Sequence, residues 1–285
     1  MLQHYILWYN GVNRKKVLKV AKIISCVAFK GGVGKTSSTA MIGFELAKRG
    51  YKTLMVDTDP QANLTSIALR TRLAQGGSQG KLKASLMKAV EDRDLTEALV
   101  NITPKLDLIG SSMDFSLYPQ LLGKHFKDYG EQVQYLSRLL EPVAKDYDFI
   151  ILDTSPGLSI FQASVLYASD FALCLMKTDP YSMQGLDNLL TYIQETVINQ
   201  YHAPRLQPLG VLPVMMQRGS LDKGILEMVT EKYGKDSLLP VIPYLPRVNR
   251  YSATGITDDE YFDQRPHRMY GEVIDEILER VNESD

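Results

Sequence analysis

A seven-residue run, KGGVGKT at residues 30–36, constrains the fold of this chain more than any other feature of its sequence. The run follows an apolar, β-branched stretch at residues 23–28 and precedes a helical pattern at residues 37–49. Strand, glycine-rich loop and helix in this order are the context of a phosphate-binding loop, whose backbone N–H groups face phosphate oxygens. Lys35 would then reach the β- and γ-phosphates, whereas the alternative is a glycine-rich turn with an incidental lysine. The residues expected to bind the nucleotide are Lys30, Gly31, Gly32, Val33, Gly34, Lys35, Thr36 and Ser37.

Short apolar runs recur along the chain, and stretches with helical periodicity separate them. Runs of this kind are typical of strands that are covered on both faces. The alternation predicts an α/β fold with a doubly wound, mostly parallel sheet flanked by helices. Helices are predicted at residues 37–49, 132–140 and 270–281. Gly50 should end the first of them and Pro142 the second. The predicted strands are residues 23–28, 53–56, 106–109, 149–152, 171–176 and 209–215.

The composition fits a soluble globular protein, because 45% of the 285 residues are hydrophobic and 23% are charged. The formal net charge of -1 excludes a uniformly basic nucleic-acid coat, so any DNA contact must come from a local patch.

Residues 22–285 are expected to form one domain containing a loop at residues 75–80. Residues 1–21 are expected to be an N-terminal extension that packs on the body or contacts a partner. Neither a signal peptide nor a run of about 18 apolar residues is found, and Cys26 and Cys174 lie in apolar stretches. A cytoplasmic location without membrane insertion is therefore expected.

Three aspartates lie where predicted strands end. Asp57 and Asp59 belong to the sequence DTDPQ, and Asp153 ends the sequence FIILD. Because the carboxyl ends of parallel strands meet at one edge of a sheet, these side chains should lie beside the phosphate loop. With the Thr36 hydroxyl as a ligand, Asp57 and Asp153 are expected to hold Mg²⁺ through bound water. Asp59 is expected to orient the attacking water, since an aspartate with a pKa near about 3.9 is a poor general base at neutral pH. An ordinary Asp-Pro turn is the alternative for Asp59.

The loop departs from the common pattern GxxxxGK[ST], because Phe29 stands at the first glycine and Lys30 follows it. With this second lysine and with DxDPQ at residues 57–61, the chain resembles the ParA/MinD superfamily of deviant Walker A ATPases, and within it the ParA/Soj type. The resemblance covers the chain from Lys22 onward and implies a P-loop fold that uses ATP and Mg²⁺. It also implies that Lys30 crosses the interface of an ATP-sandwiched homodimer, whereas a solvated loop lysine is the alternative. The expected catalytic residues are Lys30, Lys35 and Asp59.

Two later segments extend the resemblance. Residues 210–216 and 241–243 are similar to family strands whose ends flank the adenine, which assigns Met216 and Pro243 to the nucleotide. Packing in the core is the alternative for these two side chains. Residues 242–255, IPYLPRVNRYSATG, resemble the family segment that binds DNA without sequence preference. Surface ion pairs are the alternative for its arginines. The expected DNA-binding residues are Arg218, Arg247 and Arg250.

The phosphate loop alone leaves three classes of function open: a DNA-partitioning ATPase, a membrane-cycling MinD-like ATPase, and a metabolic or electron-transfer P-loop enzyme. The acidic stretch at residues 275–285 disfavours the basic amphipathic helix of a MinD-like protein. No cysteine lies between Asp153 and Asp170, which disfavours an iron–sulfur protein. The resemblance therefore implies a partition ATPase whose ATP-bound homodimer binds nonspecific DNA and whose slow hydrolysis a ParB-like partner stimulates. It also implies a cytoplasmic protein that joins the nucleoid when ATP is bound and has no membrane partner.

Overall fold

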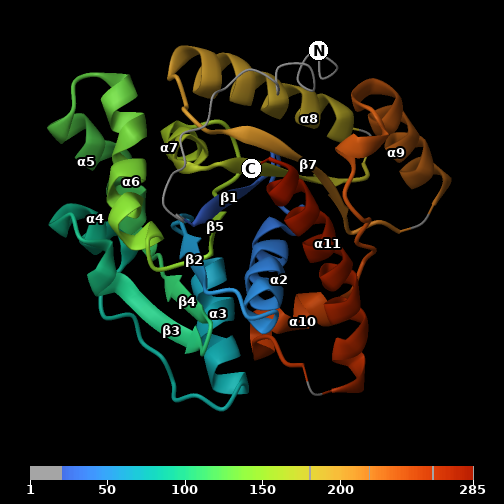
Figure 1. Ribbon diagram of the computed structural model, residues 1–285, viewed down its shortest axis with the longest axis horizontal. Helices are drawn as coiled ribbons and strands as arrows, with labels where there is room; N and C mark the ends of the chain where they lie inside the picture. Colours follow the sequence, from blue (N-terminus) through green and yellow to red (C-terminus); the bar gives the residue numbers. More distant parts are fainter. Residues whose placement is uncertain (1–20, 180, 218, 259, 285) are drawn as a thin grey trace.

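The computed structural model describes residues 21–179, 181–217, 219–258 and 260–284. The described strands form one seven-stranded sheet in the order β3-β4-β2-β5-β1-β6-β7 (Figure 1). Neighbouring strands are parallel except at one edge, where β3 runs antiparallel to β4. This is the mostly parallel sheet that the sequence predicts. The strands are β1 (Lys22–Val27), β2 (Thr53–Asp57), β3 (Leu99–Thr103), β4 (Leu106–Ile109), β5 (Phe149–Asp153), β6 (Phe171–Lys177) and β7 (Gln207–Val214).

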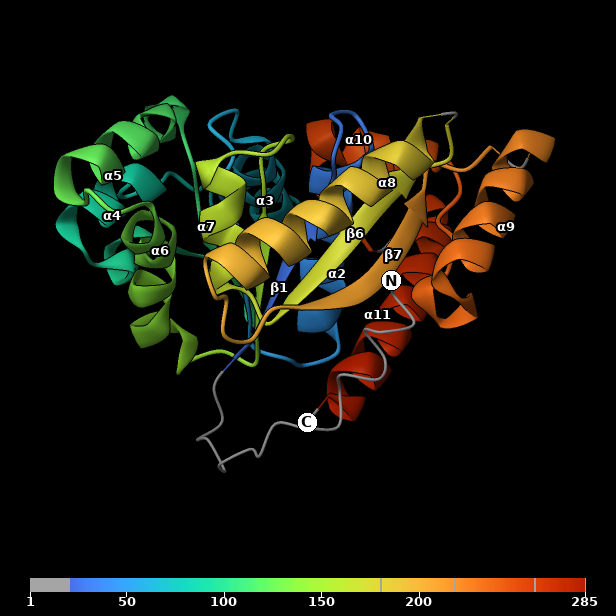
Figure 2. The same ribbon diagram turned by 90° about the horizontal axis from the view of Figure 1, so that it is seen from above.

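Helices cover both faces of the sheet (Figures 1 and 2). Ile24 of β1 packs into the core beneath α2, α3, α10 and α11, whereas its neighbour Ile23 packs into the core beneath α4 and α6. Among the described residues, no helix is both long and apolar enough to cross a membrane. The helices are α2 (Lys35–Lys48), α3 (Asn63–Ala74), α4 (Leu86–Asp92), α5 (Tyr118–His125), α6 (Tyr129–Ala144), α7 (Ile160–Ala168), α8 (Ser182–Thr191), α9 (Ser220–Tyr233), α10 (Pro246–Thr254) and α11 (Gln264–Glu283).

The sequence predicts β1, β2 and β4 to β7 with small differences at their ends, and it predicts how α2 stops. Gly50 has a φ of +94°, which a residue with a Cβ rarely adopts. Its N–H donates to the carbonyl of Ala47 at 2.9 Å, and the N–H of Tyr51 donates to that of Leu46 at 3.2 Å. These are the two hydrogen bonds of a Schellman motif, so the predicted glycine stop is confirmed.

The sequence analysis gives no residue ranges for α3 to α5 or for α7 to α10, and three other elements differ from what it predicts. The edge strand β3 was not predicted, because only part of it is buried and polar Asn101 is exposed at its centre. The predicted end of α6 before Pro142 is wrong: the helix continues to Ala144 because Val143 and Ala144 are buried in the core. Tertiary burial there outweighs the missing N–H of the proline. The last helix begins at Gln264, six residues before the predicted start at 270.

Candidate nucleotide site

The predicted phosphate loop connects the end of β1 to the first residue of α2. Gly32 and Gly34 have φ angles of +74° and +79°, so the loop needs glycine at both positions. Gly31 and Gly32 are exposed, whereas Val33 is buried and anchors the loop in the core. Because α2 begins at Lys35, its first N–H groups have no acceptor within the helix and adjoin the loop. The loop therefore has two features that an anion cradle requires, glycines with positive φ and free N–H groups at the start of a helix.

Lys35 pairs with the aspartate that ends β5. Its Nζ lies 2.8 Å from Asp153 Oδ1, and both side chains are buried. The hydroxyl of Thr39, one turn further along α2, lies 3.1 Å from the same oxygen and donates to it. Asp153 Oδ2 is also buried, and it has no hydrogen-bond partner among the described residues. This oxygen is therefore a ready acceptor for a water molecule bound to a cation.

Asp57 is a second buried carboxylate, and it lies beside Asp153 in the register of β2 and β5. Burial and then the charge of Asp153 raise the pKa of Asp57 to about 7, although hydrogen bonds from Thr65 oppose the shift. A divalent cation would relieve the repulsion between these two carboxylates. With the half-buried Thr36 hydroxyl at the start of α2, the residues present fit the predicted Mg²⁺.

Asp59 lies two residues beyond Asp57, at the edge of the same site. Its side chain is buried, and its Oδ1 accepts a hydrogen bond from the N–H of Gln61 at 3.0 Å, which closes the Asp-Pro turn. Its own N–H donates to Asp57 Oδ1 at 3.1 Å. The geometry is therefore compatible with both roles considered for Asp59. Its side chain closes the Asp-Pro turn, and it adjoins the predicted metal site, where it would orient water. No three His, Cys, Asp or Glu side chains within the described ranges are grouped to hold a metal.

Lys30 lies on the exposed side of the loop. Its side chain is 41% exposed, and its Nζ lies 3.7 Å from Asp179 Oδ1. The same ammonium group lies 4.7 Å from the centre of the Tyr181 ring. Both partners belong to the segment between β6 and α8. The Lys30 side chain therefore makes two weak, solvent-accessible contacts within the chain, which a stronger anionic partner would displace.

The structure brings the two predicted adenine-flanking residues together. Met216 and Pro243 form an isolated parallel bridge. The N–H of Met216 lies 3.3 Å from the carbonyl of Ile242, and its carbonyl accepts from the N–H of Tyr244 at 2.9 Å. Met215 connects this pair to the phosphate loop, because a Cβ placed on Gly34 would lie 3.4 Å from its sulfur. The adenine role of Met216 and Pro243 stays a prediction.

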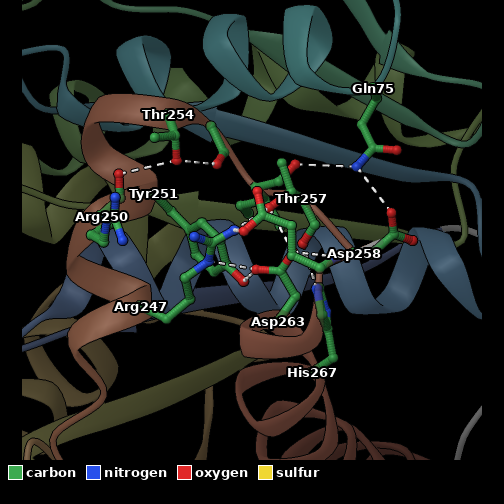
Figure 3. Close-up of polar contacts among 12 residues, drawn as sticks. Gln75, Arg247, Arg250, Tyr251, Thr254, Thr257, Asp258, Asp263 and His267 are labelled. Atoms are coloured by element: carbon green, nitrogen blue, oxygen red, sulfur yellow. Dashed lines mark hydrogen bonds and ion pairs between the residues drawn. The ribbon is translucent and has the colours of Figure 1, made fainter.

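The predicted DNA-binding arginines lie in different environments (Figure 3). Arg218 is outside the described residues. Arg250 is exposed on α10. Arg247 is only 12% exposed, and its Nε donates to the fully buried Asp263 at 2.6 Å while Nη2 lies 2.8 Å from Glu260. Burial alone would raise the pKa of Asp263, but hydrogen bonds from Arg247 and its neighbours lower it to about 2. These two acidic partners hold the Arg247 guanidinium in place, as in the ion-pair alternative, and the DNA-binding role of the arginines stays a prediction.

Sequence reasoning did not single out two threonines that hold the buried carboxylates. Thr39 binds Asp153 and lies four residues after Lys35, so it faces the sheet on the same side of α2. Thr65 binds Asp57 from the start of α3. The sequence signal that could have identified these threonines is a polar residue at a helix position that faces the sheet and is otherwise apolar.

Comparison with known proteins decides the family. A family model described as an AAA domain matches residues 21–207. The sporulation initiation inhibitor protein Soj of Bacillus subtilis is 30% identical over 243 residues, which are 82% of this chain and 87% of that protein. This chain belongs to the ParA/Soj family. The family resemblance of the KGGVGKT and DTDPQ sequences is thereby confirmed.

Solved structures share the ParA/Soj fold over most of their length. A plasmid partition protein of Borrelia burgdorferi bound to AMPPNP superposes with a TM-score of 0.75 at 21% identity, over 91% of this chain and 99% of that chain. Cobyrinic acid a,c-diamide synthase of Mycobacterium smegmatis, with ADP and magnesium, has a TM-score of 0.71 at 24% identity, over 93% of this chain and 97% of that chain. The predicted P-loop fold is confirmed, and the predicted cofactors agree with these ligands. The fold alone does not distinguish a DNA-partitioning ATPase from a metabolic P-loop enzyme.

Proposed function

We propose that this ParA/Soj-family chain is a DNA-partitioning ATPase that cycles between monomer and dimer. ATP with Mg²⁺ binds at residues 30–37, a second copy closes over the nucleotide, and the dimer binds DNA without sequence preference. Hydrolysis then releases the DNA, and a ParB-like partner accelerates this step. The observation that carries the proposal is the half-exposed Lys30, the first residue of a phosphate loop that adjoins buried Asp57 and Asp153. The protein would be cytoplasmic and would join the nucleoid when ATP is bound.

Each residue of the site has one task in this proposal. Lys35 exchanges its contact with Asp153 for the β- and γ-phosphates. Thr36 would ligate Mg²⁺ directly, and Asp57 and Asp153 would hold it through water; the ion neutralises phosphate charge. Asp59 orients the attacking water. The adenine would lie against Met216 and Pro243.

The dimer role of Lys30 gives a separable prediction. Lys30→Ala should bind ATP with parental affinity and stay monomeric, because the proposed lysine contact is made to the nucleotide of the partner. Light scattering with ATP and Mg²⁺ measures this. Asp179→Ala is the matched control, since it removes the ionic contact of Lys30 but keeps the lysine. A dimer of normal stability in Lys30→Ala would remove the assigned role.

Contacts between α10 and α3 support a link from nucleotide to DNA. The guanidinium of Arg70 on α3 donates to the carbonyl of Ser252 on α10. Gln75, which follows α3, donates from Nε2 to the carbonyl of Ile256 at 3.1 Å. Because α3 follows the turn that carries Asp59, a change in that turn would be transmitted to α10 through these contacts. Arg250 on α10 would thus be positioned by the state of the nucleotide.

Arg250→Ala tests the DNA side of the proposal. Each dimer presents two copies of Arg250, so the substitution should weaken binding of all sequences alike and flatten the log–log salt slope by about 1.8. Filter binding of unrelated DNA duplexes across a salt series measures both effects. Arg138→Ala, on the opposite face of the sheet, removes the same charge and should change neither. An unchanged slope in Arg250→Ala would place the DNA surface elsewhere.

A further inference from the structure

Thr65, which no sequence motif singled out, contacts a carboxylate of the predicted metal site. Its side chain is buried, and both its N–H and its hydroxyl donate to Asp57 Oδ2, at 2.8 and 2.7 Å. The N–H of Ser111, two residues after the end of β4, donates to the Thr65 hydroxyl oxygen at 2.9 Å. Because Ser111 can only donate here, the hydroxyl proton of Thr65 must point toward Asp57. The donor and the acceptor in both hydrogen bonds, from Ser111 to Thr65 and from Thr65 to Asp57, are therefore fixed.

The position of Thr65 in its helix strengthens the arrangement. It is the third residue of α3, so its N–H has no acceptor within the helix. Ala62, at the N-cap position, provides no side-chain acceptor, and the carboxylate of Asp57 takes that place from the neighbouring strand. The first turn of α3 and the Asp57 carboxylate therefore stabilise each other.

These contacts set the orientation of the Asp57 carboxylate. Oδ2 accepts two hydrogen bonds from Thr65, which occupy both of its acceptor positions. Oδ1 accepts one, from the N–H of Asp59 at 3.1 Å. Oδ1 therefore keeps an acceptor position for water on a cation, whereas rotation of the carboxylate would break the contacts with Thr65.

We propose that Thr65 is a positioning residue for magnesium-dependent nucleotide binding, acting through Asp57 and itself oriented by the N–H of Ser111. The inference rests on the proposed ATPase function. Partners that hold a metal-binding group usually contribute about 10–100-fold to metal affinity or activity. The expected role is thus measurable without complete loss of function.

The test compares three variants of the full chain by calorimetry, using a non-hydrolysable ATP analogue with Mg²⁺ and with EDTA. Thr65→Val keeps the shape of the side chain but loses the hydroxyl, and we expect the gain in affinity due to Mg²⁺ to fall about 10–100-fold while affinity in EDTA stays parental. Thr65→Ser should restore the gain, since the hydroxyl returns. Thr71→Val is the matched control: Thr71 is buried on the same helix, and its hydroxyl oxygen accepts from the N–H of Ile256 at 2.9 Å, away from the carboxylates. It should keep the parental response to Mg²⁺.

Three outcomes would overturn the role of Thr65: a parental Mg²⁺ response in Thr65→Val, no restoration in Thr65→Ser, or an equal loss in Thr71→Val. Circular dichroism checks folding, and if Thr65→Val does not fold, Thr65→Cys replaces it, because a thiol is a weaker donor of similar size. A parental Mg²⁺ response in Thr65→Cys would likewise overturn the role. If the unsubstituted chain binds no ATP analogue at all, the proposed function fails instead.

Discussion

Replacing Lys35 with alanine should reduce the affinity for ATP and Mg²⁺ by about a hundredfold or more. The lysine is buried beneath the phosphate loop with its Nζ 2.8 Å from Asp153, within the same site as the expected phosphates. Hydrogen bonds to charged groups contribute about 1.5–3 kcal/mol each, and about 1.4 kcal/mol corresponds to a factor of ten. Loss of two such contacts gives the expected factor. Calorimetry of ATP and Mg²⁺ binding measures it.

Lys48→Ala is the matched control for this substitution. Lys48 lies at the far end of α2, is exposed, and pairs with Asp258 at 3.2 Å, so ATP affinity should be unchanged. Lys35→Ala also leaves the buried charge of Asp153 without its cation, so thermal unfolding of both variants must be compared with the parent. Undiminished ATP affinity in a folded Lys35→Ala protein would mean that residues 30–36 are not a phosphate cradle.

Asp59→Ala should slow hydrolysis by about a hundredfold, which corresponds to about 2.7 kcal/mol of transition-state stabilisation. The ATP-bound dimer should form and persist, because Lys35, Thr36 and Asp57 keep their places. The expected loss comes from water that is no longer oriented, since the N–H of residue 59 still reaches Asp57. Single-turnover phosphate release, with light scattering in parallel, measures both properties.

Asp59→Asn separates chemistry from turn formation. An asparagine oxygen can still accept the hydrogen bond from the N–H of Gln61, which closes the turn in the parent. If the charge orients water, the asparagine variant should hydrolyse as slowly as the alanine variant. Parental turnover in Asp59→Asn would identify Asp59 as a turn residue, and parental turnover in Asp59→Ala would exclude any catalytic role.

The sequence predicts the strands that lie inside the sheet better than elements whose burial depends on neighbours. The sequence predicts β1 and β5 clearly, because both strands are apolar almost throughout and are covered on both faces. β3 is an edge strand with alternating exposure, so its composition is close to that of a loop. Continuation of α6 through Pro142 depends on the burial of Val143, which only the folded chain defines.

The candidate site shows the same limit. The motifs predict that Lys35, Asp57 and Asp153 meet at one edge of the sheet, because Lys35 follows the loop after β1 and the two aspartates end β2 and β5. Their roles stay predictions. Thr65 was missed because its role depends on a hydrogen bond from Ser111, 46 residues away along the chain. Arg247 pairs with Asp263, 16 residues later and fully buried, as well as with Glu260, and no local sequence pattern predicts this ion pair.

DNA binding measured with ATP, with ADP and without nucleotide tests the central claim most directly. The proposal joins the phosphate loop to α10 and makes DNA affinity depend on an ATP-bound dimer. We expect the chain to bind unrelated duplexes equally well with ATP and Mg²⁺, and far more weakly in the other two states, in filter binding at one fixed salt concentration. Equal DNA binding in all three states, or none with ATP, would contradict the partition function and favour a metabolic enzyme of the same fold.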